Sequence, residues 1–259
     1  MIQAVTTPEH QGEFIRRLGD KPYFAATMGT HCALFAAHPA SGWQFYLLPG
    51  SGALALRGGS AALCGTLPGG PKGEKTEELQ GFLRFLGVER LLCEEMPLSG
   101  WLAAEPLLLW ELPQGGCLPL PAPPPAGLTL EEHPAMQPVS RLVFPDSEAE
   151  REAFYSLACT AQAHGIGCCR ALLHREQPVC TVGCYERSDT EAYLSAGVTA
   201  PGWRGRGLAG WLIASLANQL AAHRTVRFAS IPALEVFYRR LGFTRAGVLQ
   251  QYTREWEKV

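Results

Sequence analysis

The sequence predicts an α/β protein built from two parts, and three observations support this prediction. Strand-like and helix-like apolar patterns alternate through the C-terminal half of the 259-residue chain. A proline-rich segment at 113–127 separates that half from a fainter version of the same pattern. A β-rich run that ends at Thr199 leads through a glycine-bearing turn directly into an apolar-periodic helix. We therefore expect an N-terminal α/β domain (1–112), a semi-rigid linker (113–127) and a C-terminal domain (128–259).

The C-terminal half has the clearer periodicity. Apolar residues at helical spacing follow an acidic start at Asp146, and Pro178 falls where two strand-like runs need a turn. Pro232 suits the first turn of a later helix. In order, the expected elements are a strand at 128–132, a helix at 146–163, a hairpin of 170–175 and 179–186, a strand at 191–199, a helix at 205–223, a strand at 226–230, a short helix at 234–243 and closing strands at 243–256.

The N-terminal half repeats this order less distinctly. The expected elements are helices at 8–18 and 75–86 and strands at 32–37, 44–48, 54–56, 61–64 and 88–93. Its loop at 65–73 contains glycines, but Pro68 and Pro71 remove backbone donors that a phosphate would need. Two interpretations stay open: a degenerate copy of the C-terminal fold that no longer binds a phosphorylated cofactor, or an unrelated α/β lid.

The turn after Thr199 has the features of a phosphate site. Backbone N–H groups and the positive end of a helix dipole converge where a glycine-bearing turn opens a helix. Gly205 and Gly207 carry no Cβ to keep a pyrophosphate away from the backbone. Arg204 and Arg206 add positive charge at the same place.

Two motifs in this half resemble the GNAT superfamily of N-acetyltransferases. The acyl-CoA pyrophosphate loop, Arg/Gln-x-x-Gly-x-Gly/Ala, is matched by Arg204, Gly207 and Ala209. The Tyr-x-x-x-Gly-Phe segment is matched by Tyr238, Gly242 and Phe243. The resemblance covers the chain from about residue 128 onward. It implies a mixed, mostly antiparallel sheet flanked by helices, and direct transfer of an acetyl group from acetyl-CoA to a primary amine in a ternary complex.

The resemblance also implies which residues hold acetyl-CoA. The pyrophosphate would lie on the loop formed by Arg204, Gly205, Arg206, Gly207, Leu208 and Ala209. The pantetheine amides would pair with the end of the preceding strand, at Gly197, Val198 and Thr199. Gly197 is the expected site of a β-bulge in this strand, although a strand glycine can equally relieve crowding.

Two residues are candidates for proton transfer. Tyr238 matches the tyrosine that protonates the CoA sulfur in many family members, and a phenol with a pKa near 10 suits that task. The alternative interpretation is that Tyr238 is a packed helix residue without a catalytic role. Glu191, at the start of the strand that leads to the loop, is the candidate base, with Glu186 and His174 as weaker alternatives. The alternative for Glu191 is an exposed glutamate at a strand edge.

One position departs from the family pattern. Ile231 stands where many members have an asparagine near the pantetheine arm, and the neighbouring Ser230 is a candidate helix cap. This departure favours a second interpretation, a non-catalytic acyl-CoA sensor or pseudoenzyme. The resemblance leaves the acceptor amine and a homodimer open.

Composition limits the partners, cellular location and metal binding that we expect. The formal net charge of −2 argues against a nucleic-acid partner, even with the short Arg/Gly run at 204–207. No secretory signal and no apolar run of about 20 residues is apparent, so we expect a cytoplasmic protein without a membrane partner. The nine cysteines include clusters at 168–169 and at 180 and 184, but their spacing does not match a zinc site, so we expect no metal.

Overall fold

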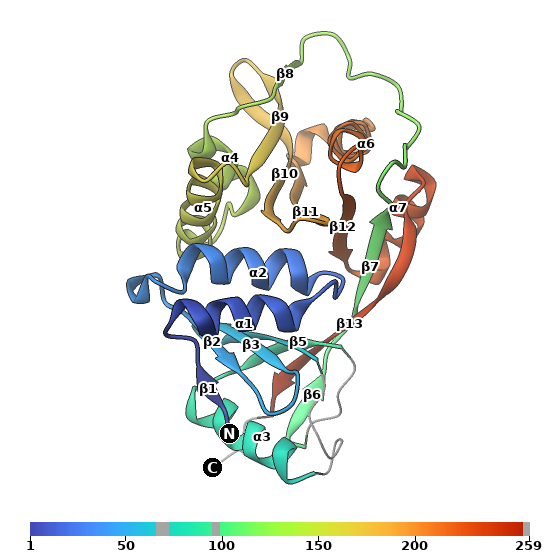
Figure 1. Cartoon of the computed structure of the whole chain (residues 1–259). Helices are drawn as coiled ribbons and strands as arrows, with labels where there is room; N and C mark the ends of the chain where they lie inside the picture. Colours follow the sequence, from blue (N-terminus) through green and yellow to red (C-terminus); the bar gives the residue numbers. More distant parts are fainter. Residues whose placement is uncertain (66–72, 95–98, 256–259) are drawn as a thin grey trace. The chain divides into compact units, whose positions relative to one another are not determined.

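A computed structural model describes residues 1–65, 73–94 and 99–255, which form two compact units (Figure 1). Unit 1 contains residues 1–109, 229–235 and the chain from 245 onward, and unit 2 contains 110–228 and 236–244. The units are interleaved in sequence, unlike the contiguous domains expected at 1–112 and 128–259. The reason is that the last strand, β13 (Thr244–Arg254), pairs antiparallel with β5 (Arg90–Cys93) of unit 1.

Unit 1 begins with a short strand that forms one edge of its sheet, followed by two helices. Its elements are β1 (Gln3–Ala4), α1 (Pro8–Leu18), α2 (Phe24–Phe35), the 3-10 helix η1 (Pro39–Ser41), β2 (Trp43–Leu47), β3 (Ala53–Arg57), β4 (Ser60–Cys64), α3 (Glu74–Phe85), β5, β6 (Trp101–Ala103) and β7 (Leu107–Leu112), the last of which crosses into unit 2. The sheet order is β1-β2-β3-β4-β5-β13, and β6 also pairs with β13. Strands β1 to β4 pair antiparallel in succession, whereas β4 and β5 are parallel.

Unit 2 repeats the same plan. Its elements are β8 (Thr129–Glu131), α4 (Met136–Val143), α5 (Glu148–Ala163), β9 (Cys168–His174), β10 (Gln177–Arg187), β11 (Glu191–Thr199), η2 (Pro201–Trp203), α6 (Leu208–Ala221), β12 (Thr225–Ser230) and α7 (Glu235–Leu241). Unit 1 also includes the end of β12, η3 (Pro232–Leu234) and β13 from Arg245 onward. The sheet order β8-β9-β10-β11-β12 is antiparallel up to β11 and then parallel. Both units therefore share the order β-α-α-β-β-β-α-β, and the mixed, mostly antiparallel sheet is confirmed.

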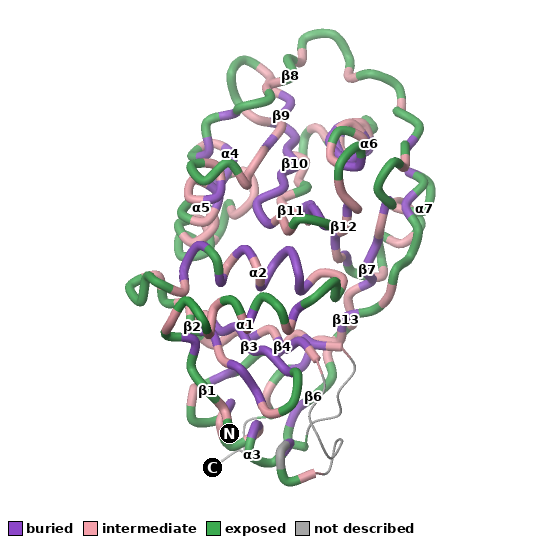
Figure 2. The backbone as a smooth tube through the Cα atoms, in the orientation of Figure 1, coloured by how far each residue is buried: buried purple, intermediate pink, exposed green. Residues whose placement is uncertain are grey.

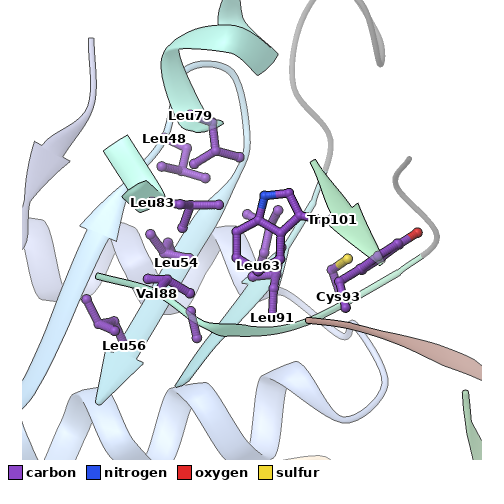
Figure 3. Packing of buried hydrophobic residues seen from close by; sticks show 12 residues of the cluster. Leu48, Leu54, Leu56, Leu63, Leu79, Leu83, Val88, Leu91, Cys93 and Trp101 are labelled. Atoms are coloured by element: carbon purple, nitrogen blue, oxygen red, sulfur yellow. The ribbon is translucent and has the colours of Figure 1, made fainter. Parts of the chain in front are cut away.

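The core of unit 1 lies between its sheet and α3 (Figure 3). Leu79 and Leu83 of α3 are fully buried against strand residues that include Leu54, Leu63 and Leu91. Each such leucine contributes about 1.5–3 kcal/mol when it is removed from water. The N-terminal half therefore has a hydrophobic core of its own.

Helices cover both faces of the sheet in unit 2. In Figure 1, α4 and α5 lie on one side of β10 and β11, and α6 lies on the other side. Ser147 caps α5 by accepting a hydrogen bond from the N–H of Glu150. The turn between β9 and β10 places Arg175 and Glu176 at φ values of 48° and 66°, which closes a tight hairpin.

Two helices differ from the sequence-based expectation. The strand expected at 32–37 is wrong, because residues up to Phe35 belong to α2. Figure 2 shows this helix as an almost continuously buried tube, so its sequence lacks the polar stripe that marks a helix. Helix α4 was not expected, because it is short and contains Pro138.

The proline-rich segment, expected to be a semi-rigid linker, is hydrogen-bonded to α6 of unit 2. Asn218 of α6 accepts a hydrogen bond from the Leu118 N–H (2.7 Å) and donates one to its carbonyl oxygen (2.9 Å). The Gly115 N–H also donates to the carbonyl of Ala221 at 2.7 Å. Of the expected N-terminal loop, 66–72 lies outside the described residues, as does Trp256 of the closing strands. No helix in the described part of the chain is long and apolar enough to cross a membrane.

Candidate functional site

The loop between β11 and α6 presents a row of free backbone donors. Gly205 and Gly207 adopt left-handed conformations, with φ values of 74° and 73°, and Gly207 occupies the N-cap of α6. The first bond of the helix runs from the N–H of Trp211 to the Gly207 carbonyl. Within the described chain, none of the N–H groups of 205–210 donates to another residue. These donors and the helix dipole favour an anion at this point.

The two loop arginines are held at the edge of this row of donors. The Arg204 Nε donates to the Thr199 carbonyl at 3.1 Å, and the Arg206 guanidinium donates to the Gly202 carbonyl at 3.1 Å. Arg206 also lies over the Trp203 ring, 4.7 Å from its centroid. Both arginines remain exposed, so their remaining donors face solvent and can reach a phosphate.

Strand β11 contains the bulge that was expected near its end. On β10 the register advances from Thr181 to Gly183, while on β11 it goes from Val198 to Ser195, which leaves an extra residue on β11. The residue with positive φ is Ala196 (54°), however, and not the expected Gly197. A left-handed alanine costs about 1–2 kcal/mol, so the surrounding packing must hold this bend.

Strands β11 and β12 are paired over only part of their length. Among the described residues, their parallel pairing comprises Glu191↔Thr225, Ala192↔Val226 and Tyr193↔Arg227. Both strands continue beyond this point, to Thr199 and Ser230. In unit 1 the corresponding pair, β4 and β5, stays in register from Ser60↔Arg90 to Leu63↔Cys93. Only the second unit therefore combines a bulge with a strand separation that leads to its glycine turn.

Tyr238 lies on α7 in an aromatic cluster within unit 2. Its ring centroid is 4.4 Å from that of Phe228, 5.9 Å from Trp110 and 6.3 Å from Phe243. Burial raises the pKa of the Tyr238 phenol above its ordinary value of 10. The hydroxyl therefore carries its proton at neutral pH, as a proton donor requires.

Glu191 is buried, unlike the exposed strand-edge glutamate of the alternative interpretation. Its side chain is 1% exposed, and its Oε2 lies 2.5 Å from a terminal nitrogen of Arg227. The same guanidinium reaches Glu111 at 3.2 Å. No sequence pattern indicates this Glu191–Arg227–Glu111 network, because its members come from three separate strands, β11, β12 and β7. Its effect is to fix the Glu191 carboxylate in place.

The weaker candidates have distinct environments. Glu186 is buried on β10, opposite Tyr193 of β11. His174 contacts Trp203, with ring centroids 4.9 Å apart, and thus lies next to the loop. Ile231 is exposed and occupies the N-cap of η3, whereas Ser230 donates to the Ile231 carbonyl, so the expected capping role of Ser230 is wrong.

The two cysteine clusters lie on neighbouring strands, with Cys168 and Cys169 on β9 and Cys180 and Cys184 on β10. Across 1–65, 73–94 and 99–255, no group of three or more His, Cys, Asp or Glu side chains is arranged to hold a metal ion. All nine cysteines are thiols.

Comparisons with known proteins agree with this geometry. Residues 157–245 match the sequence model of the family described as acetyltransferase (GNAT) domain. No curated protein matches the sequence. A tandem GNAT protein from the clavulanic acid biosynthesis pathway, solved without AcCoA, is similar over 100% of this chain and 99% of its own, with a TM-score of 0.66 and 16% identity.

Two further solved structures are similar over nearly the full length. A GCN5-related N-acetyltransferase from Sphaerobacter thermophilus has a TM-score of 0.66 and 14% identity, over 100% of this chain and 96% of its own. A GNAT-family acetyltransferase from Colwellia psychrerythraea has a TM-score of 0.59 and 13% identity, over 98% and 99% of the two chains. At these identities the likeness concerns the fold. Residues 157–245 therefore match the GNAT acetyltransferase domain, and the full-length chain has a fold similar to that of the tandem GNAT protein.

Proposed function

We propose that this protein is an acyl-CoA-dependent N-acetyltransferase that moves an acetyl group from acetyl-CoA to a primary amine by direct transfer in a ternary complex. The observation that supports this most strongly is the combination, in unit 2, of free N–H donors at 205–210 with the separation of β11 from β12. The diphosphate of acetyl-CoA needs hydrogen-bond donors, and its pantetheine arm, an extended chain with amide groups, needs an unpaired strand edge. The first unit has no such separation in its β4–β5 pair.

The acetyl-CoA site that we propose extends along the end of β11 and the loop. Its diphosphate would accept hydrogen bonds from the backbone of Gly205, Arg206, Gly207, Leu208 and Ala209, with Arg204 supplying further charge. Its pantetheine amides would pair with Gly197, Val198 and Thr199, which lie beyond Tyr193, the last residue of β11 that pairs with β12. Acetyl-CoA acts as a cosubstrate, and no metal enters the proposed reaction.

The proposed chemistry needs one proton donor and one acceptor. The amine nitrogen attacks the thioester carbonyl carbon, a C–N bond forms and the C–S bond breaks. Tyr238 gives its phenolic proton to the departing sulfur; burial raises its pKa, which keeps the phenol protonated at neutral pH but also makes it a weaker acid. The amine loses a proton to a base, for which we propose Glu191, directly or through water. The Arg227 partner holds that carboxylate in position.

The test is turnover by the full-length protein with acetyl-CoA and a panel of primary amines, followed by chromatographic detection of free CoA. We expect Tyr238→Phe to lower kcat by about 100-fold, the usual range for a lost general acid, with little change in acetyl-CoA affinity. Phe237→Tyr serves as a control on the same helix, since it adds a phenol beside the site and leaves Tyr238 in place. Unchanged kcat in Tyr238→Phe would remove Tyr238 from the mechanism.

One observation favours a second candidate, a non-catalytic acyl-CoA sensor or pseudoenzyme that acts through protein contacts. Ile231 is apolar and 46% exposed where many family members carry an asparagine. A sensor would bind acetyl-CoA without turnover of any amine, and Tyr238→Phe would then leave the affinity unchanged. We expect no nucleic-acid or membrane partner, and place the protein in the reducing cytoplasm in view of its free thiols.

A further inference from the structure

Strands β9 and β10 place two cysteines directly opposite one another. Cys168, the first residue of β9, is the register partner of Cys184 of β10. Residues opposite each other in an antiparallel pair have Cα atoms about 4.5–5.5 Å apart and side chains on the same face. A disulfide requires a Cα separation of about 4.4–6.8 Å. The backbone therefore already satisfies the distance requirement for a bond between these two residues.

The surroundings of the pair activate one of the two thiols. A hydrogen bond from Cys184 lowers the pKa of Cys168 to about 7, and the guanidinium groups of Arg187 and Arg170 contribute in the same direction. The hydrogen bond with Cys168, burial, the Cys168 charge and the Glu186 carboxylate, two residues along the same strand, raise the pKa of Cys184. Cys168 is half-buried, whereas Cys184 is fully buried. Near neutral pH one thiol is thus partly ionised and partly exposed, and the other is protonated and buried.

We propose that Cys168 and Cys184 form a reversible oxidation site, in which Cys168 reacts with a hydroperoxide and Cys184 closes the disulfide. In the first step the Cys168 thiolate attacks a peroxide oxygen, an S–O bond forms, the O–O bond breaks, and the departing oxygen takes a proton and leaves as water or an alcohol. In the second step the Cys184 sulfur attacks Cys168, an S–S bond forms and the S–O bond breaks. The departing hydroxyl oxygen, which already carries one hydrogen, takes the Cys184 proton and leaves as water.

The other cysteines lack this combination. Burial raises the pKa of Cys32, Cys64 and Cys93 to about 12, which leaves them inert as nucleophiles. Cys169 and Cys180 are likewise buried, and burial raises the pKa of both. In the described sheet ladders, Cys168 and Cys184 are the one pair of cysteines in direct register. This site is independent of the proposed acetyl transfer.

The test uses the reduced full-length protein treated with one equivalent of hydrogen peroxide, followed by peptide mapping under conditions that preserve disulfides. We expect a peptide pair joined through Cys168 and Cys184, restored to thiols by a dithiol reductant. In Cys184→Ser the disulfide should be lost, and a sulfenic-acid probe should label Cys168 instead. Cys159→Ser, which removes a different half-buried thiol, is the matched control and should keep the disulfide.

A second measurement needs no variant. The rate of Cys168 alkylation by iodoacetamide, followed by mass spectrometry, should rise with a midpoint near pH 7 instead of the ordinary value of 9.0. Peroxide oxidation mainly at Cys117 or Cys159, with Cys168 and Cys184 left as thiols, would overturn the proposal. An alkylation midpoint near 9 would overturn it as well.

Discussion

Neutralising Glu191 tests the buried network beside the proposed site. Glu191→Gln keeps the shape of the side chain and removes its charge, so Arg227 is left with Glu111 as its remaining acidic partner. Removing one partner of a buried ion pair costs about 3–5 kcal/mol when the other charge is left uncompensated. Arg227 is 17% exposed and keeps Glu111, which is 28% exposed, so we expect a smaller loss. We estimate about 2 kcal/mol of unfolding free energy.

The assay is urea unfolding followed by circular dichroism, with Glu111→Gln as the matched control. The control carries the same chemical change against the same arginine at a more exposed position, so its cost should be about 0–1 kcal/mol. A loss below about 0.5 kcal/mol in Glu191→Gln would refute the reasoning, as would a larger loss in the control. If Glu191 is also the base, kcat should fall further than the loss of folded protein explains.

Three more predictions concern residues around the site. Because the pKa of Tyr238 is raised on folding, its contribution to stability is complete below about pH 10 and is lost as the pH rises through the folded value; alkaline unfolding of Tyr238→Phe should lack this component. Gly183→Ala should cost about 1–3 kcal/mol in urea unfolding, since its Cβ would lie 2.5 Å from the buried Tyr185 ring, and an unchanged midpoint would contradict this packing. Asn218→Ala should cost about 2 kcal/mol and speed proteolysis within 113–127, because Leu118 loses its two hydrogen bonds to Asn218; equal cleavage rates would show that Asn218 does not hold the segment.

Sequence periodicity predicts most of unit 2 because its elements alternate sharply. The strand at 191–199 has the expected bounds, and the helix after it begins at Leu208, a few residues after the expected start at Gly205. The glycines at 205 and 207 do adopt the left-handed conformation that only glycine adopts readily. The apolar periodicity and the glycines of this segment are sufficient to predict the strand, the helix and the turn between them.

The features that the sequence could not reveal depend on contacts between distant segments. Helix α2 is buried almost all round, so its apolar residues have no helical stripe to recognise. The Glu191–Arg227–Glu111 network joins three strands. The hydrogen bonds between Asn218 and Leu118 join residues 100 positions apart. An asparagine within the apolar helix α6 was the one available signal. The bulge was expected at a glycine, but packing holds Ala196 in that conformation instead.

Calorimetric titration with acetyl-CoA determines whether unit 2 alone carries an acyl-CoA site. We predict one site per chain with micromolar affinity, retained by desulfo-CoA and much weaker for ATP. Gly207→Val should abolish binding, because it fills the loop and disfavours the left-handed backbone. Gly165→Val introduces the same strain at φ 69° outside the loop and should bind normally. No binding at millimolar acetyl-CoA, or two equivalent sites per chain, would contradict the account.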